Sequence, residues 1–216
     1  MKGPQMKELR KIQANPDNSI LMVIDIDNEG DGPVGGMPEP TPELSKKATI
    51  PVVRRLIDGA HEAGVQVIYM QSVRHHLLPQ IAVFGRARKR LIGTHSSEIV
   101  DELTPESQDI VVRKWDHDPW FETDLERVLD GLVPESTTCQ VLIAGGGITG
   151  CAFFGAVGFS VRNFPTVVVL DAVHSFPTVA ARHWSRTNYP TYPNIYLTRS
   201  ELIEFSKVSE PVTAGR

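Results

Sequence analysis

The stretch Val141-Leu-Ile-Ala-Gly-Gly-Gly-Ile-Thr-Gly-Cys151 decides the fold. It joins a short, continuous apolar run, 141–144, to a glycine-rich turn over 145–150 that ends at a cysteine. A continuous apolar run of this length is typical of a strand buried on both faces, as in a parallel sheet. In such sheets the turn after a strand leads into a helix, and ligands bind beyond the carboxyl ends of the strands. The stretch therefore predicts both a parallel sheet and the place of its site.

Five further apolar runs of the same kind surround this one, and helical patterns lie between them. The runs are Ile20–Ile24, Val65–Met70, Ile110–Val112, Thr166–Leu170 and Ile195–Leu197. Apolar stripes over 52–60 and 125–132 indicate helices, and Thr123-x-x-Glu126 predicts a capping box for the second. The alternation predicts an α/β fold: a three-layer, doubly wound, six-stranded, mainly parallel sheet with helices on both faces.

Composition indicates one globular domain of ordinary make-up. The chain has 216 residues, 41% hydrophobic and 22% charged, which predicts a single domain over 1–216 with an N-terminal arm at 1–19 and a C-terminal tail at 207–216. A net charge of −4 without long runs of one sign argues against nucleic-acid and anionic-membrane partners. The N-terminal segment carries charges where a signal peptide needs apolar residues, and no apolar run approaches membrane-span length. We expect a cytoplasmic protein.

Three reactive side chains follow three different predicted strands. Asp25 ends the first, Lys114 follows the third, and Cys151 follows the fourth. Taken singly, such residues usually cap helices, face water or fill cores, but the topology delivers all three to one sheet edge. A thiol at a helix N-terminus beside an ammonium loses its proton more easily, and a nearby carboxylate accepts it. The trio predicts a nucleophile and its base.

The glycine turn supports two different functions. Its backbone N–H groups suit an oxyanion hole, since glycines permit a close approach and the following helix favours negative charge. The same Gly145–Gly150 turn also fits the dinucleotide fingerprint, and Asp171 ends the next strand, where a ribose-binding acid would lie. An NAD(P)-dependent oxidoreductase is therefore an alternative. It is less favoured because that fingerprint normally opens its domain.

The combined motifs resemble those of the isochorismatase-like cysteine hydrolase family over roughly residues 18–200. The similarity lies in the opening strand with Asp25 and Asn28, in the lysine segment, and in the glycine turn. In the chain these read Val23-Ile-Asp25, Leu103-Thr-Pro105 with Ile110-Val-Val-Arg-Lys114 and Trp120-Phe121, and the turn ending at Cys151 with Asp171-Ala172 twenty residues on.

The resemblance implies a cysteine-dependent amidohydrolase that cleaves a C–N bond of a small carboxamide, carbamoyl or ureido compound. Cys151 would form a thioester, Asp25 would carry the proton to the leaving nitrogen, and Lys114 would favour the thiolate. Backbone N–H groups of Gly147 and Cys151, after a cis peptide at Gly146-Gly147, would hold the oxyanion. No cofactor is implied. Hydrolysis of the isochorismate vinyl ether is less favoured, since those relatives generally lack the cysteine.

Some positions depart from the family pattern. Asp27 stands where an amide is usual, and Ile148 stands where threonine is common, which leaves open a non-catalytic member of the fold. The second strand is followed by 71–74 without the Asp-x-His metal motif of nicotinamidase-like relatives, so we predict no metal. His75 and His76 are adjacent and point apart on regular backbone, which does not suit zinc.

Further residues are candidates for binding a small amide or ureide. They share a place at the end of the second or third strand or in the following loop: Gln71, Trp115, His117, Trp120 and Phe121. Packing or subunit contact is the alternative role for the aromatic ones. The basic stretch 86–90 suits either a carboxylate-bearing substrate or a solvated helix face. The resemblance also implies a homodimer or homotetramer.

Overall fold

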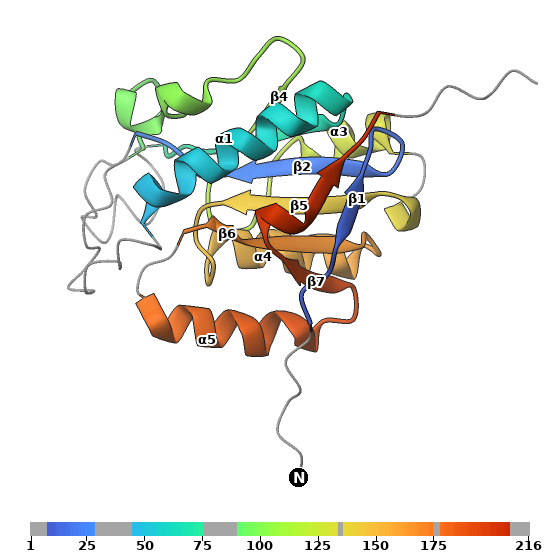
Figure 1. Ribbon diagram of the computed structural model, residues 1–216. Helices are drawn as coiled ribbons and strands as arrows, with labels where there is room; N and C mark the ends of the chain where they lie inside the picture. The colour runs from blue at the N-terminus through green and yellow to red at the C-terminus, as the bar shows by residue number, and fades with distance from the viewer. Residues whose placement is uncertain (1–7, 29–44, 76–89, 134–135, 175–177, 208–216) are drawn as a thin grey trace, which may run out of the picture.

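The computed structural model describes residues 8–28, 45–75, 90–133, 136–174 and 178–207, and its centre is a six-stranded parallel sheet (Figure 1). The strands lie in the order β4-β3-β2-β5-β6-β7. Their bounds are β2 Ser19–Ile24, β3 Gln66–Ser72, β4 Ile110–Lys114, β5 Gln140–Gly145, β6 Thr166–Val173 and β7 Ile195–Thr198. The chain enters at β2, builds outward to β4, and returns to β5 on the other side of β2. This is the doubly wound order that the sequence predicts, with its switch point between β2 and β5.

Helices cover both faces of the sheet, as predicted. Helix α1, Lys46–Ala63, packs on one face together with a small parallel pair made of β1, Ile12–Ala14, and β8, Ile203–Phe205. Helices α3, Leu125–Leu132, and α4, Cys151–Val161, pack on the other face. Helix α5, Thr178–Asn188, joins that second layer through Trp184.

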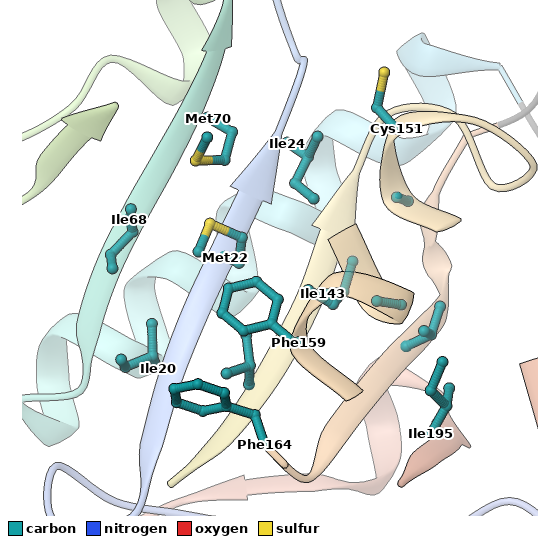
Figure 2. Close-up of a cluster of buried hydrophobic side chains, with 14 of the residues drawn as sticks. Ile20, Met22, Ile24, Ile68, Met70, Ile143, Cys151, Phe159, Phe164 and Ile195 are labelled. Atoms are coloured by element: carbon teal, nitrogen blue, oxygen red, sulfur yellow. The ribbon is translucent and has the colours of Figure 1, made fainter. Parts of the chain in front are cut away.

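Alternate residues of the inner strands β3, β2, β5 and β6 enter the two cores, which explains their continuous apolar runs. Along β2, Ile20, Met22 and Ile24 lie in the α4 core with Phe159 (Figure 2), while the residues between them lie in the α1 core. All six residues of β2 are buried. A strand covered on both faces needs apolar side chains at every position, so the sequence shows runs rather than alternation.

Local details differ from the sequence predictions. The strands extend beyond the predicted runs, so that Lys114 is the last residue of β4 rather than a residue after it. The predicted capping box is wrong: α3 begins after Asp124, and the Thr123 hydroxyl donates to the Pro119 carbonyl at 2.6 Å. It also accepts from the Leu125 N–H at 3.3 Å. The Thr123 hydroxyl is thus used in local contacts with Pro119 and Leu125, and the helix starts one residue later than predicted.

Part of the predicted N-terminal arm is an ordered element of the molecule. Ile12 and Ala14 of β1 are buried, and β1 pairs with β8 close to the other end of the chain. The prediction of one domain over 1–216 stays a prediction, and most of the predicted tail lies outside the described residues. No helix in the described ranges has both the length and the apolar character of a membrane span.

Gly145 at the end of β5 is a position where the backbone requires glycine. Its φ is +106°, and an added Cβ would collide with the backbone of Ile24 on the neighbouring strand. We expect Gly145→Ala to lower the free energy of unfolding by more than about 2 kcal/mol, because strain and steric overlap act together. Urea denaturation followed by circular dichroism measures this.

Gly131 provides the matched control for that substitution. It lies inside α3, and nothing stands within 4 Å of an added Cβ. Gly131→Ala is expected to leave stability unchanged or raise it by up to about 1 kcal/mol. Equal stability of the two variants would contradict the constraint assigned to the β5 turn.

Candidate active site

The three predicted reactive side chains meet at the carboxyl edge of the sheet. Asp25 follows β2, Lys114 ends β4, and Cys151 begins α4 directly after the β5 turn. The Lys114 Nζ lies 2.9 Å from Asp25 Oδ2 and 3.3 Å from Cys151 Sγ. Figure 2 shows the sulfur of Cys151 pointing away from the apolar cluster beneath it. The convergence expected from topology is therefore present.

Asp25 leaves the strand geometry as soon as β2 ends. Its φ is +52°, a left-handed value that aspartate tolerates better than most residues, and its N–H donates to the Met70 carbonyl at 3.0 Å. The side chain packs against Gly146, where an added Cβ would lie 3.0 Å from the Asp25 Cβ. A glycine at 146 thus makes room for the carboxylate.

Lys114 reaches its partners across the width of two strands. Strands β4 and β2 are separated by β3, a span of about 10 Å between outer strands, so a long side chain is needed. Lys114 is fully buried, and its ammonium also donates to the Asp116 carbonyl at 2.8 Å. An ammonium has three N–H donors, and the carboxylate, the sulfur and this carbonyl give it three partners.

Mutual attraction keeps the buried pair charged. Burial alone would raise the pKa of Asp25, but the positive charges of Lys114 and Arg90 outweigh it and hold that pKa below its ordinary value. Burial likewise opposes the charged form of Lys114, and the Asp25 carboxylate outweighs it, so the lysine pKa is raised. Both groups are ionised at neutral pH.

Cys151 is a protonated thiol in the resting site. Burial raises its pKa to about 12, the Asp25 charge adds to this, and Lys114 opposes it without prevailing. Lys114 lowers the pKa of the thiol, as the sequence predicts, but the burial of the sulfur, which the sequence does not show, outweighs that effect. A nucleophilic role for Cys151 therefore requires the proton to leave during attack. Asp25 Oδ1 is buried and has no hydrogen-bond partner in the described part of the chain, so its lone pairs are available.

The glycine turn presents unpaired backbone donors, two of them on the residues implied for the oxyanion hole. The N–H groups of Gly146, Ile148 and Gly150 donate to backbone carbonyls, whereas those of Gly147, Thr149 and Cys151 have no partner among residues the structure describes. An added Cβ on Gly147 would lie 3.0 Å from the Cys151 nitrogen, so these two residues are in close contact. The Gly146-Gly147 peptide is trans, and the implied cis bond is wrong.

His117 is a candidate binding residue that contacts the Cys151 sulfur. Its Nδ1 stands 3.1 Å from Cys151 Sγ. Its ring stacks on Phe154 of α4, with centroids 5.9 Å apart and planes 16° from parallel. Unlike the sulfur, this histidine is exposed.

Comparison with known proteins identifies the family of this chain and solved structures with the same fold. The family model of the isochorismatase domain matches residues 19–188. The chain belongs to the isochorismatase-domain family. Among solved structures of this fold, N-carbamoylsarcosine amidase from Thermoplasma acidophilum is 24% identical with a TM-score of 0.68, covering 85% of this chain and 97% of that one. A cysteine hydrolase from Pseudomonas syringae pv. phaseolicola is 17% identical with a TM-score of 0.71, covering 90% and 94%.

Curated relatives carry the name ureidoacrylate amidohydrolase RutB. The protein of Acinetobacter baylyi is 27% identical over 142 residues, which are 56% of this chain and 58% of that protein. The protein of Agrobacterium fabrum is 28% identical over 138 residues, 55% and 60% of the two chains. The chain thus spans less than two thirds of the length of these curated relatives.

His174 is a residue of this isochorismatase-domain site that sequence reasoning missed. It follows β6, and its backbone N–H donates to Gly145 at 3.0 Å while its carbonyl accepts from Ile148 at 2.9 Å. Burial lowers the pKa of its side chain to about 4, so the ring is neutral. Its position after a strand carboxyl end was the available signal, the same one that identified Asp25.

Gln71 and Trp115 direct their polar groups to loop backbone. The Gln71 amide donates to the Ser97 carbonyl at 2.7 Å. The Trp115 indole donates to the Glu122 carbonyl at 3.1 Å. Neither contact reaches the sulfur, and their roles in substrate binding stay predictions.

Trp120 and Phe121 also lie away from the sulfur contacts. Trp120 packs edge-on against Phe159 at 4.9 Å, and Arg162 stacks over its ring at 3.9 Å. This is the packing role that the sequence left open for it. Phe121 is 58% exposed. Substrate binding by either residue stays a prediction.

The positions that depart from the family pattern do not contact the sulfur. Asp27 is buried and pairs with Arg90, whose Nε lies 2.6 Å from Oδ2, and its carbonyl accepts from Lys46 at 2.7 Å. Burial, with Asp25 adding and Arg90 opposing, raises the pKa of Asp27 to about 6. The Ile148 side chain belongs to the α4 core. Of the basic stretch, 86–89 lie outside the described residues.

The features that suggested dinucleotide binding are used within the protein. Asp171 caps the turn at Ser200, accepting its N–H at 2.8 Å and its hydroxyl at 2.6 Å. The glycine turn packs on Asp25 and His174. In the part of the chain that the structure describes, no three His, Cys, Asp or Glu residues cluster as metal ligands; His75 is exposed and His76 lies outside that part.

Asp25 and Lys114 act on the pKa of Cys151 in opposite directions, so removing either charge should shift that pKa in opposite directions. Asp25→Asn removes a charge that raises the Cys151 pKa, so the pH dependence of alkylation by iodoacetamide should move to lower pH. Lys114→Met removes a charge that lowers it and should move the curve to higher pH. Peptide mass spectrometry reads the two cysteines separately.

Arg113→Gln is the matched control for these charge changes, since Arg113 is the exposed neighbour of Lys114 on β4. Its alkylation curve should coincide with that of the unmodified protein. Shifts of the same sign in the Asp25 and Lys114 variants would contradict the electrostatic account of the thiol.

Proposed function

We propose that this protein hydrolyses a C–N bond of a small carboxamide, carbamoyl or ureido compound through a Cys151 thioester. The observation that carries the proposal is the position of the Lys114 ammonium, in contact with both the sulfur and the Asp25 carboxylate. Beside it lie the unpaired N–H groups of Gly147 and Cys151. A nucleophile, a base and oxyanion donors in contact are what acyl transfer from nitrogen requires.

The first half of the reaction transfers the acyl group to sulfur. As Sγ bonds to the substrate carbonyl carbon, Asp25 takes the thiol proton, and the carbonyl oxygen becomes an oxyanion held by the two N–H groups. When the C–N bond breaks, the proton passes from Asp25 to the leaving nitrogen. Lys114 keeps its charge throughout, which stabilises the carboxylate before transfer and the sulfur as it loses its proton.

The second half of the reaction returns the enzyme to its resting state. Water adds to the thioester carbon, the C–S bond breaks, and the product leaves as a carboxylic or carbamic acid. The sulfur regains a proton and becomes the thiol again. Because the resting thiol has a raised pKa, this return to the protonated form is favourable.

The ureide and carbamoyl classes are supported by the curated relatives, which are named ureidoacrylate amidohydrolase. The presence of the cysteine in contact with Lys114 favours C–N hydrolysis over isochorismate vinyl-ether hydrolysis and over a non-catalytic role.

A cytoplasmic location and a homodimeric or homotetrameric state are part of the same proposal. Two free thiols suit a reducing compartment. Phe154 and Val161 on α4 are 46% and 64% exposed, and covering this apolar helix would favour association.

Removal of the proposed nucleophile tests the function directly. A screen of ureidoacrylate, N-carbamoyl amino acids and small carboxamides for ammonia release should find an active compound. Cys151→Ala should then lower turnover by roughly 10⁴-fold or more, as loss of a central catalytic group does in comparable sites. Retained turnover in that variant would refute the thioester mechanism.

Cys139 supplies the control, because it is a buried cysteine whose pKa is raised to about 11 by burial alone. Cys139→Ala should keep full turnover. Thermal unfolding of both variants separates a catalytic loss from a folding defect.

A further inference from the structure

The two halves of the proposed reaction place their proton transfers in different surroundings. In the first half the thiol proton moves within a buried site, where Asp25 is 4% exposed. In the second half the proton comes from a water molecule, which has to arrive from solvent. A base for that water is best placed where the site opens to solvent.

His117 meets this requirement by its position. Its Nδ1 lies 3.1 Å from Cys151 Sγ, yet the residue is exposed whereas the sulfur is only 8% exposed. The ring therefore contacts the nucleophile and solvent at once. Stacking on Phe154 fixes the plane of the ring, and Gly150 lies beneath it, with an added Cβ 3.7 Å from Nδ1.

The other groups that touch the sulfur are less suited to activate water. The ammonium of Lys114 has no lone pair, and all its donors are engaged. Asp25 is only 4% exposed and its Oδ2 lies 2.9 Å from that ammonium, so incoming water reaches it less readily than it reaches the exposed His117 ring. Within the described residues, His117 is the neutral acceptor that contacts both the sulfur and the surface.

We propose that His117 is the base that hydrolyses the thioester, an inference that rests on the proposed function. Its imidazole accepts a proton from the attacking water as the water oxygen bonds to the thioester carbon. When the C–S bond breaks, the electron pair goes to sulfur and the imidazolium returns the proton across the 3.1 Å contact. Atoms and charges balance, and no further reactant is needed.

The charges around the ring keep it ready to accept a proton. Burial lowers the pKa of His117, Lys114 and Arg74 add to this, and Asp116 and Asp25 oppose it, so the pKa lies below its ordinary value. These groups come from β4, the end of β3, the loop of His117 itself and the end of β2. At neutral pH the imidazole is unprotonated, and acid should slow thioester hydrolysis as it protonates the ring.

The experiment uses 4-nitrophenyl acetate, which acylates cysteine nucleophiles and reports each half of the reaction. Release of nitrophenolate measures formation of the acetyl thioester, and the later steady rate measures its hydrolysis. His117→Gln should keep a burst of one nitrophenolate per active site and then slow the steady rate by about 10²-fold or more. Mass spectrometry should find the acetyl group accumulating on Cys151.

Two further readouts separate a base from a residue that only shapes the site. Hydroxylamine, a stronger nucleophile than water, should restore turnover to the His117→Gln variant. The decline of the steady rate in acid should be present in the unmodified protein and absent from the variant. Loss of burst and steady rate together, without hydroxylamine rescue, would overturn the proposal.

Matched variants distinguish this proposal from the function on which it rests. His183→Gln changes an exposed histidine on α5 and should leave both phases unchanged. Cys151→Ala should abolish the burst. A burst that persists in Cys151→Ala would contradict the proposed nucleophile, whereas a steady rate that His117→Gln leaves unchanged would contradict the role of His117 alone.

Discussion

The buried ion pair between Lys114 and Asp25 is the interaction on which the rest of the site depends. Removing two charges from water costs several kcal/mol per ion, and only close contact with good partners offsets this. Here the ammonium finds the carboxylate at 2.9 Å, the sulfur at 3.3 Å and a backbone carbonyl at 2.8 Å. The pair also depends on the strand order. Only β3 lies between β4 and β2, so a lysine at the end of β4 can reach the end of β2.

The pair determines the chemistry of the sulfur as well as its surroundings. A lone ammonium beside the thiol would favour the thiolate, but burial and the Asp25 carboxylate outweigh Lys114 and raise the pKa of Cys151. In the proposed mechanism the site supplies a proton acceptor on each side of the sulfur, with Asp25 on the buried side and the His117 ring on the exposed side.

Sequence reasoning predicts the parts of this site that topology controls. Apolar runs identify strands because burial on both faces demands them, and parallel strands deliver Asp25, Lys114 and Cys151 to one edge whatever the loops do. It does not predict which partner a loop side chain chooses. Trp120 packs under α4, and Gln71 turns to a backbone carbonyl, because these contacts depend on loop paths that no local pattern records.

The raised pKa of Cys151 could not be predicted from the sequence for a different reason. Helix position and neighbouring charges are legible in a sequence, but the extent of burial that outweighs them depends on packing. His174 was missed for another reason. It also follows a strand, but it lies three residues beyond Asp171, which the sequence suggested as a ribose-binding acid. Its backbone bonds to Gly145 and Ile148 on the two sides of the glycine turn, and the type of a side chain does not predict such backbone contacts.

Asp27 contributes to the electrostatics of the site through its ion pair with Arg90. Asp27 holds Arg90 at 2.6 Å, and Arg90 is, after Lys114, the positive charge that most lowers the pKa of Asp25. An amide at this position would hold the guanidinium less strongly, since charge-assisted contacts are roughly twice as strong as neutral ones. The departure from the family pattern thus supports the ionised carboxylate on which the proposed mechanism relies. Asp27 does so without contacting the sulfur, and Lys46 and Arg90 offset the negative charge that it adds.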